Sequence, residues 1–222
     1  CMAIGLPISW ALCLSSFSAY LAMDNHMPIA ILSQRIFTGA DSFGLLAVPA
    51  FIIAGEIMSA GGISKRLIDM AGVFIGRVRG SLALVSIVAC TLFAALSGSA
   101  TATTAAIGGI MYPEMVKRKY PEDFSAAVQA IGGTLGPVIP PSILVIFYGI
   151  GTGVSISKLL IAGVIPGLIS CAFLCLMAYV MAIRGNMPKE ESNSTAMEKI
   201  TAVKSAVWAL LMPIIILGGI YT

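Results

Sequence analysis

The chain has 222 residues, of which 58% are hydrophobic and only 10% are charged, and its formal net charge is +3. Soluble domains carry about 25% charged residues, so this composition excludes an ordinary soluble protein and predicts an integral membrane protein. The few dispersed charges also exclude a nucleic-acid surface, which requires a basic patch with interleaved aromatic residues. We therefore expect membrane lipid, and no nucleic acid, among the partners.

Six apolar segments follow one another along the chain, with one amphipathic segment between the second and the third. A bilayer requires about 20 apolar residues for each spanning helix. Residues 63–79 mix basic and apolar side chains, which predicts an amphipathic helix along the membrane interface. The six apolar segments are Met2 to Met23, Phe43 to Ala60, Gly80 to Pro113, Phe124 to Ser157, Leu159 to Ile183 and Ala202 to Tyr221.

The third apolar segment is expected to enter and leave the membrane on one side. Arg77 and Arg79 precede it, and the basic run Lys117 to Lys119 follows it. The positive-inside rule assigns both flanks to the cytoplasm, and the segment is too short for two full spans of about 20 residues each. The sequence therefore predicts a re-entrant helical hairpin over residues 80–117, with its tip at Ser97 to Thr104.

The fourth segment, residues 124–157, is predicted to cross the membrane once, as a discontinuous helix that is unwound around Gly136 to Pro141. Basic residues precede it, and none lies in Gly149 to Gly153 near its far end. Pro137, Pro140 and Pro141 remove backbone donors and disfavour helix before them, which frees carbonyl oxygens. Two such breaks at membrane depth indicate a binding site near the bilayer midplane.

The hairpin tip offers hydroxyl oxygens, and the unwound helix offers carbonyl oxygens, without a carboxylate. This donor set suits a weakly held monovalent cation, so we expect sodium as the ligand and no organic cofactor. Two plainer interpretations stay open: close packing of small residues at the tip, and a proline kink that binds nothing. The tip hydroxyls belong to Ser97, Ser99, Thr101, Thr103 and Thr104.

Enzymatic chemistry finds no support in the sequence, because the tip serines have no general base near them and membrane depth holds no carboxylate pair. His26 is the one histidine, and we expect it in an external loop, with Arg35 on the same side of the membrane. Glu56 lies in an apolar helix but close to its end, so a functional role and a position at the interface both stay open. Gln129 could form a hydrogen bond across helices or to substrate, and packing is the favoured role.

Two motifs, LFAALSGSATATTAAIGGIMYPEM and AIGGTLGPVIPPSILVIFYG, resemble the large membrane subunit (DctM type) of the tripartite ATP-independent periplasmic, or TRAP, transporters. The similarity extends through VPAFIIAGEIMSAGGISKRLIDMA and LLIAGVIPGLI, and so covers most of residues 1–222. The family's subunit is about twice as long, so the chain looks like its N-terminal half. A second hairpin and a second broken helix are expected in the other half.

This resemblance implies an all-α polytopic bundle that is one half of an inverted-repeat, elevator-type ion-transporter fold. It also implies sodium-coupled import of a small organic anion, such as a carboxylate, across a bacterial or archaeal inner membrane. The implied partners are a periplasmic substrate-binding protein and a small TRAP membrane subunit. Two alternatives remain: an anion transporter of the same superfamily that works without a binding protein, and a membrane scaffold subunit that does not transport.

The resemblance also implies which residues bind. The family's first sodium site matches two serines at the hairpin tip and three backbone carbonyls in the unwound helix. The substrate is expected to approach the same two elements, where small residues leave room. The sodium residues are Ser97, Ser99, Gly136, Ile139 and Pro141, and the substrate residues are Gly98, Thr101, Thr104, Pro140 and Ser142.

Overall fold

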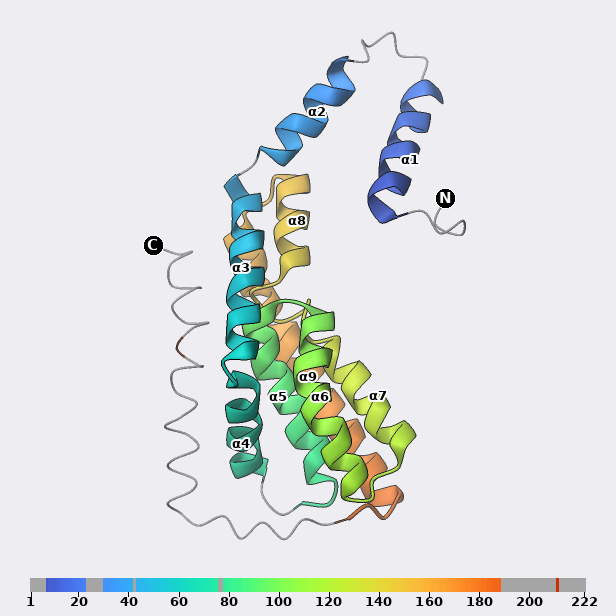
Figure 1. Cartoon of the computed structure of the whole chain (residues 1–222), viewed down its shortest axis with the longest axis vertical. Coiled ribbons are helices and arrows are strands. Elements are labelled where there is room, and N and C mark those ends of the chain that lie inside the picture. Colours follow the sequence, from blue (N-terminus) through green and yellow to red (C-terminus); the bar gives the residue numbers. More distant parts are fainter. Residues whose placement is uncertain (1–6, 23–29, 42, 76–77, 189–210, 212–222) are drawn as a thin grey trace. The chain divides into compact units, whose positions relative to one another are not determined.

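The computed structural model describes residues 7–22, 30–41, 43–75, 78–188 and 211, and the secondary structure in this part of the chain is helical (Figure 1). The expected all-helical architecture is thereby confirmed. The chain divides into a first unit, Cys1–Ser42, and a second unit, Phe43–Thr222, and each is described by itself. The predicted segment Ala202 to Tyr221 lies outside the described residues, apart from Leu211.

The first unit contains α1 (Ile8–Ala22) and α2 (Ala30–Ala40). Helix α1 lies inside the first predicted apolar segment. Helix α2 was not predicted as a helix, because its 11 residues are too few for a span and include Ser33 and Gln34. Its hydroxyls bond within the helix, as Thr38 Oγ1 does to the Gln34 carbonyl at 2.8 Å.

The second unit holds the remaining described helices. Helix α3 has the predicted boundaries, whereas the segment predicted from Leu159 begins three residues earlier, at Ile156. These helices are α3 (Phe43–Ala60), α4 (Ile63–Ile75), α5 (Ser81–Ser97), α6 (Ala100–Lys117), α7 (Glu122–Gly133), α8 (Ile143–Thr152) and α9 (Ile156–Arg184).

Helix α9 is the longest helix among the described residues. Its 29 residues span about 43 Å at 1.5 Å per residue, and among the described helices it is the one long and apolar enough to cross a bilayer. Helices α7 and α8 together run alongside it. Tyr120, just before α7, donates a hydrogen bond from its hydroxyl to the Pro188 carbonyl at 3.4 Å, just past the end of α9. Gly149 of α8 packs against Ile156 at the start of α9.

Helices α5 and α6 form an antiparallel pair joined by two residues. The pair begins near the end of α9, where Arg79 Nη1 donates to Asn186 Oδ1 at 3.0 Å. Helix α5 has 17 residues and spans about 25 Å, so the pair turns back well short of the full length of α9. Buried Phe93 and Leu96 of α5 pack with Ile107 and Met111 of α6 in one apolar core.

Helix α4 packs its apolar face against this pair of helices. Leu67, Met70 and Ala71 are buried in the same core, whereas Lys65 and Arg66 are exposed. The alternation follows the amphipathic pattern of the sequence, which places apolar side chains on one face of the helix. The position of residues 63–79 at a membrane interface stays a prediction.

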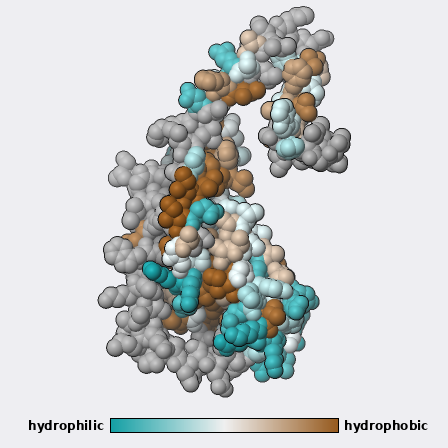
Figure 2. Space-filling model, in the orientation of Figure 1, coloured by the Kyte–Doolittle hydropathy of each residue, from teal (hydrophilic) through white to brown (hydrophobic). Residues whose placement is uncertain are grey.

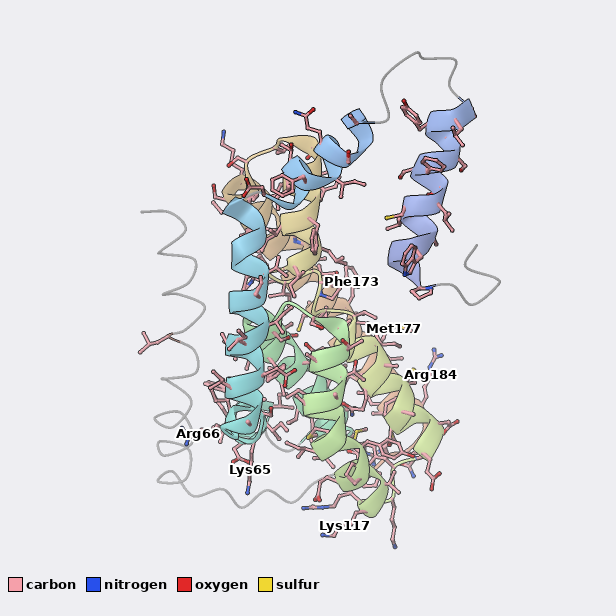
Figure 3. All side chains as sticks on the ribbon, turned by 45° about the horizontal axis from the view of Figure 1, so that its top comes forward. Lys65, Arg66, Lys117, Phe173, Met177 and Arg184 are labelled. Carbon is pink, nitrogen blue, oxygen red and sulfur yellow. The ribbon has the colours of Figure 1, made fainter. Side chains whose placement is uncertain are left out.

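Polar and apolar side chains occupy different parts of the second unit. In Figure 2 hydrophobic residues gather over the middle of α3, whereas hydrophilic residues gather over α4 and the turn between α6 and α7. In Figure 3, Lys65, Arg66 and Lys117 extend from the end of the unit that holds α4 and the turn between α6 and α7, which we call the basic end. Phe173 and Met177 of α9 are 64% and 60% exposed. This basic end includes Lys117, from one of the two flanks predicted to lie in the cytoplasm.

Candidate functional site

Four helix ends meet where the tip of the α5–α6 pair touches the break between α7 and α8. A Cβ atom placed on Gly136 would lie 2.5 Å from the carbonyl carbon of Ser99 and 2.6 Å from its oxygen. A Cβ atom on Gly98 would overlap the carbonyl oxygen of Pro141. The backbones of the tip and the break are therefore in direct contact at two points, which only glycine permits at these positions.

The tip is tighter than the sequence predicted. Helix α5 ends at Ser97, Gly98 adopts the left-handed conformation with a φ of 60°, and its N–H donates to the Ala94 carbonyl. Ser99 then caps α6, because its Oγ accepts from the Ala102 N–H at 3.4 Å. The predicted tip extended to Thr104, but residues 101–104 belong to the first turns of α6.

The tip hydroxyls form a small network. Thr103, which is fully buried, donates from Oγ1 to the Ser99 carbonyl at 2.8 Å. Because that bond uses its single hydroxyl proton, the 2.9 Å contact between Thr103 and Ser97 requires Ser97 Oγ to be the donor. Ser97 Oγ also accepts a long contact from the Ser99 N–H at 3.4 Å, and a hydroxyl oxygen with two lone pairs can in addition coordinate a cation.

Thr103 was counted among the tip hydroxyls but not assigned to the site. The spacing of four residues from Ser99 was the available signal, because a threonine hydroxyl in a helix bonds back to the carbonyl four residues before it. The structure makes Thr103 the residue that orients Ser97.

The break leaves a run of carbonyl oxygens without backbone partners. The Leu135 carbonyl accepts from the Val138 and Ile139 N–H groups, and the next carbonyl that accepts is that of Ser142, from Ile146 at 3.2 Å. Among the described residues, the carbonyls of residues 136–141 accept no backbone hydrogen bond. This interval contains the predicted carbonyl donors at Gly136, Ile139 and Pro141, and the Pro140–Pro141 peptide is cis.

Helix α9 holds the other side of the break through two glycines. The Ile139 side chain packs on Gly167, where an added Cβ would lie 2.8 Å from Ile139 Cγ1. The Pro140 ring packs on Gly163 at 3.5 Å from the corresponding position. These glycines lie about 10 to 17 Å from the start of α9, so the break sits well inside its length of about 43 Å.

The residues predicted to meet substrate are placed in different surroundings. Beside Gly98, the position that a Cβ would occupy is filled by the Pro141 carbonyl oxygen. Ser142 is buried and caps α8, accepting from the Val145 N–H at 3.4 Å. Thr104 faces Gly133 of α7, and Thr101 is exposed, with its hydroxyl 3.0 Å from Ser99 Oγ. A role for these residues in substrate binding stays a prediction.

The remaining candidates fall outside the contact between tip and break. Gly55 of α3 lies against Ser97, because a Cβ added at Gly55 would lie 3.6 Å from Ser97 Cα, and the adjacent Glu56 is exposed. Gln129 packs on Gly108 of α6 and also accepts a hydrogen bond from Ser86 of α5 at 2.7 Å, which is the cross-helix bond that the sequence left open beside packing. His26 lies outside the described residues. The described part of the chain contains no group of three or more His, Cys, Asp or Glu residues that could hold a metal ion.

Comparison with known proteins covers the whole sequence. The family described as "Tripartite ATP-independent periplasmic transporter, DctM component" matches residues 1–222. The 2,3-diketo-L-gulonate TRAP transporter large permease protein YiaN of Escherichia coli is 43% identical over 218 residues, which are 98% of this chain and 51% of that protein. The C4-dicarboxylate TRAP transporter large permease protein DctM of Vibrio cholerae is 43% identical over 221 residues, 99% of this chain and 48% of that protein.

A sialic acid TRAP transporter large permease protein, SiaM of Vibrio cholerae, is 36% identical over 219 residues, 98% of this chain and 51% of that protein. The chain thus spans about half the length of the curated relatives it matches. These relatives are permease subunits and not enzymes, in agreement with the sequence analysis.

Proposed function

Because the chain belongs to the DctM family of tripartite ATP-independent periplasmic transporters, we propose that it forms part of a sodium-coupled importer. The substrate would be a small organic anion of the carboxylate class, carried across the inner membrane. The names of the relatives support this class, since they specify C4-dicarboxylate, 2,3-diketo-L-gulonate and sialic acid. The partners would be a periplasmic substrate-binding protein and a small membrane subunit.

The observation that carries the proposal is the contact between the tip and a break with free carbonyls. The C-terminal ends of α5 and α7 present carbonyl oxygens there, and C-terminal helix ends favour cations. Ser97 Oγ and the carbonyls of Gly136, Ile139 and Pro141 together supply hydroxyl and carbonyl oxygens without a carboxylate. Broken helices coordinate sodium with such groups in several transporter folds.

The same junction also offers a place for an anion. Helices α6 and α8 begin there with Ser99 and Ser142 as their capping residues, and N-terminal helix ends favour negative charge. A bound cation between the opposite helix ends would hold the tip and the break together. Sodium would thereby favour the state that binds substrate, which is coupling through differential affinity.

The hairpin geometry supports entry from one side of the membrane. Helix α5 spans about 25 Å and α9 about 43 Å, so the hairpin stops at the level of the break. The hydrocarbon core is about 30 Å thick, and a helix pair that begins at the basic end would reach its interior without crossing it. Re-entrance and elevator-type motion are part of this proposal.

The test uses the complete transporter, with the full-length subunit and both partners in vesicles. Uptake of a C4-dicarboxylate should require a sodium gradient, should fall to background when choline replaces sodium, and should depend on the binding protein. Ser97→Ala should raise the sodium concentration for half-maximal uptake several-fold. Ser125→Ala is the matched control, because this buried serine bonds to the Pro121 carbonyl at 2.8 Å, away from the site.

The alternatives give different results in the same vesicles. Uptake that continues without the binding protein would identify an anion transporter that works alone. A scaffold subunit would give no uptake and no sodium-dependent stability. An unchanged sodium dependence in the Ser97→Ala protein would refute the proposed cation site.

A further inference from the structure

A buried polar contact joins α7 to the hairpin away from the candidate site. Ser86 Oγ of α5 donates to Gln129 Oε1 of α7 at 2.7 Å, and Gln129 Nε2 lies 3.4 Å from the sulfur of Met115 in α6. Ser86 and Gln129 are 0% and 4% exposed. The Gln129 side chain packs closely on Gly108 of α6, where an added Cβ would lie 3.4 Å from Gln129 Cβ.

Ser86 and Gln129 are too far from the hairpin tip to contact a cation bound at the proposed sodium site. Gln129 lies seven residues before Gly136, and Ser86 lies eleven residues before Ser97, which correspond to about 10 Å and 17 Å at the rise of an α-helix. Any effect on the site must therefore pass through the position of α7.

Between Gln129 and the break, α7 meets the hairpin through glycines. Gly132 faces the sulfur of Cys90, where an added Cβ would lie at 2.9 Å, and Gly133 faces Thr104. Small residues let membrane helices approach closely. Phe124 and Val128, earlier in α7, pack with Ile87 and Met115 in an apolar core. Along Gly132 and Gly133, however, α7 has few ridges that could resist sliding, so close approach there does not by itself fix the register. A directional hydrogen bond fixes the register, because sliding one helix by about 1 Å along the other lengthens and misaligns the bond.

We propose that the Ser86–Gln129 hydrogen bond positions α7 along the hairpin and thereby sets the affinity of the site for sodium. This inference rests on the proposed function. When the bond is intact, the backbone of Gly136 lies against the backbone of Ser99. When it is lost, α7 samples other registers, and only the fraction of molecules with the correct register binds the cation. The apparent dissociation constant rises in inverse proportion to that fraction.

The experiment is a sodium titration of the intact transporter complex with thermal unfolding as the readout and choline chloride keeping ionic strength constant. Ser86→Ala and Gln129→Leu should each raise the midpoint sodium concentration about three- to tenfold, as expected for one hydrogen bond. Saturating sodium should still give a full stabilising shift. The double variant should match the single variants, because both remove one interaction.

Thr91→Val is the matched control. Thr91 also lies on α5 and is buried, but its hydroxyl bonds to the Ile87 carbonyl at 2.9 Å and contacts the sulfur of Cys171 on α9 at 3.0 Å. Its sodium midpoint should be that of the unaltered protein. A purely structural role for Gln129 would lower the unfolding temperature equally with and without sodium, at an unchanged midpoint, and that result would overturn the inference.

The two proposals fail in different ways. If the unaltered complex shows no sodium-dependent shift, the proposed function is wrong, and this inference falls with it. If the unaltered complex responds to sodium while Ser86→Ala and Gln129→Leu keep its midpoint, only the positioning role is wrong.

Discussion

Replacing Gly136 by alanine is expected to separate the hairpin tip from the break. The added Cβ would lie 2.5 Å from the Ser99 carbonyl carbon, 2.6 Å from its oxygen and 2.7 Å from the Ala100 nitrogen. Ordinary van der Waals contact begins at 3.4 Å, so relief requires a displacement of about 0.9 Å. The opposing atoms are all backbone, and no side-chain rotation can provide this displacement.

Overpacking of this kind lowers the free energy of unfolding by about 1 to 3 kcal/mol. The substitution should also weaken sodium binding, because the carbonyl of Gly136 is one of the proposed ligands. We expect the sodium dissociation constant to rise at least tenfold. At sodium one hundred times the original constant, binding stabilises the native protein by about 2.7 kcal/mol, and a tenfold weaker site retains about 1.4 kcal/mol.

The assay is thermal unfolding of the full-length complex over a series of sodium concentrations, with choline as the replacement cation. Gly109→Ala in α6 is the matched control, because a Cβ there meets no atom within 4 Å. That variant should keep the sodium dependence and gain about 0.5 to 1 kcal/mol of stability from a better helix former. A Gly136→Ala protein with the original stability and sodium midpoint would refute the reasoning.

Three further substitutions separate effects on sodium binding from effects on packing alone. Gly98→Ala places a Cβ against the Pro141 carbonyl oxygen at a φ of 60°, so sodium-dependent stabilisation should disappear in the titration. Gly167→Ala should lower the unfolding free energy by about 1 to 3 kcal/mol, and adding Ile139→Ala should relieve the overlap, measured by chemical unfolding. Gly80→Ala, at a φ of 72° and remote from the site, should lower the unfolding temperature without changing the sodium midpoint.

Composition and the glycine and proline residues were enough to predict the membrane character of this protein and where two of its helices end. The scarcity of charge predicted a membrane protein, and the glycine and proline runs marked where two helices stop. The structure ends α7 at Gly133 and begins α8 at Ile143, around the interval predicted to be unwound. These features are local, because proline and glycine act on the backbone through their own dihedral angles and missing donors. Helix α2 was missed because a short helix with polar residues lacks the membrane signal.

The sequence also named the groups that could bind a cation, but it could not say how they meet. The contact of Gly136 with Ser99, the seat of Ile139 on Gly167 and the link from Ser86 to Gln129 all join residues far apart in the chain. Such contacts depend on how closely two helices approach and in which register. Local sequence leaves both the distance and the register open. Only the packing of the second unit decides them, because a glycine allows close approach only where the backbone or side chain of another helix lies against it.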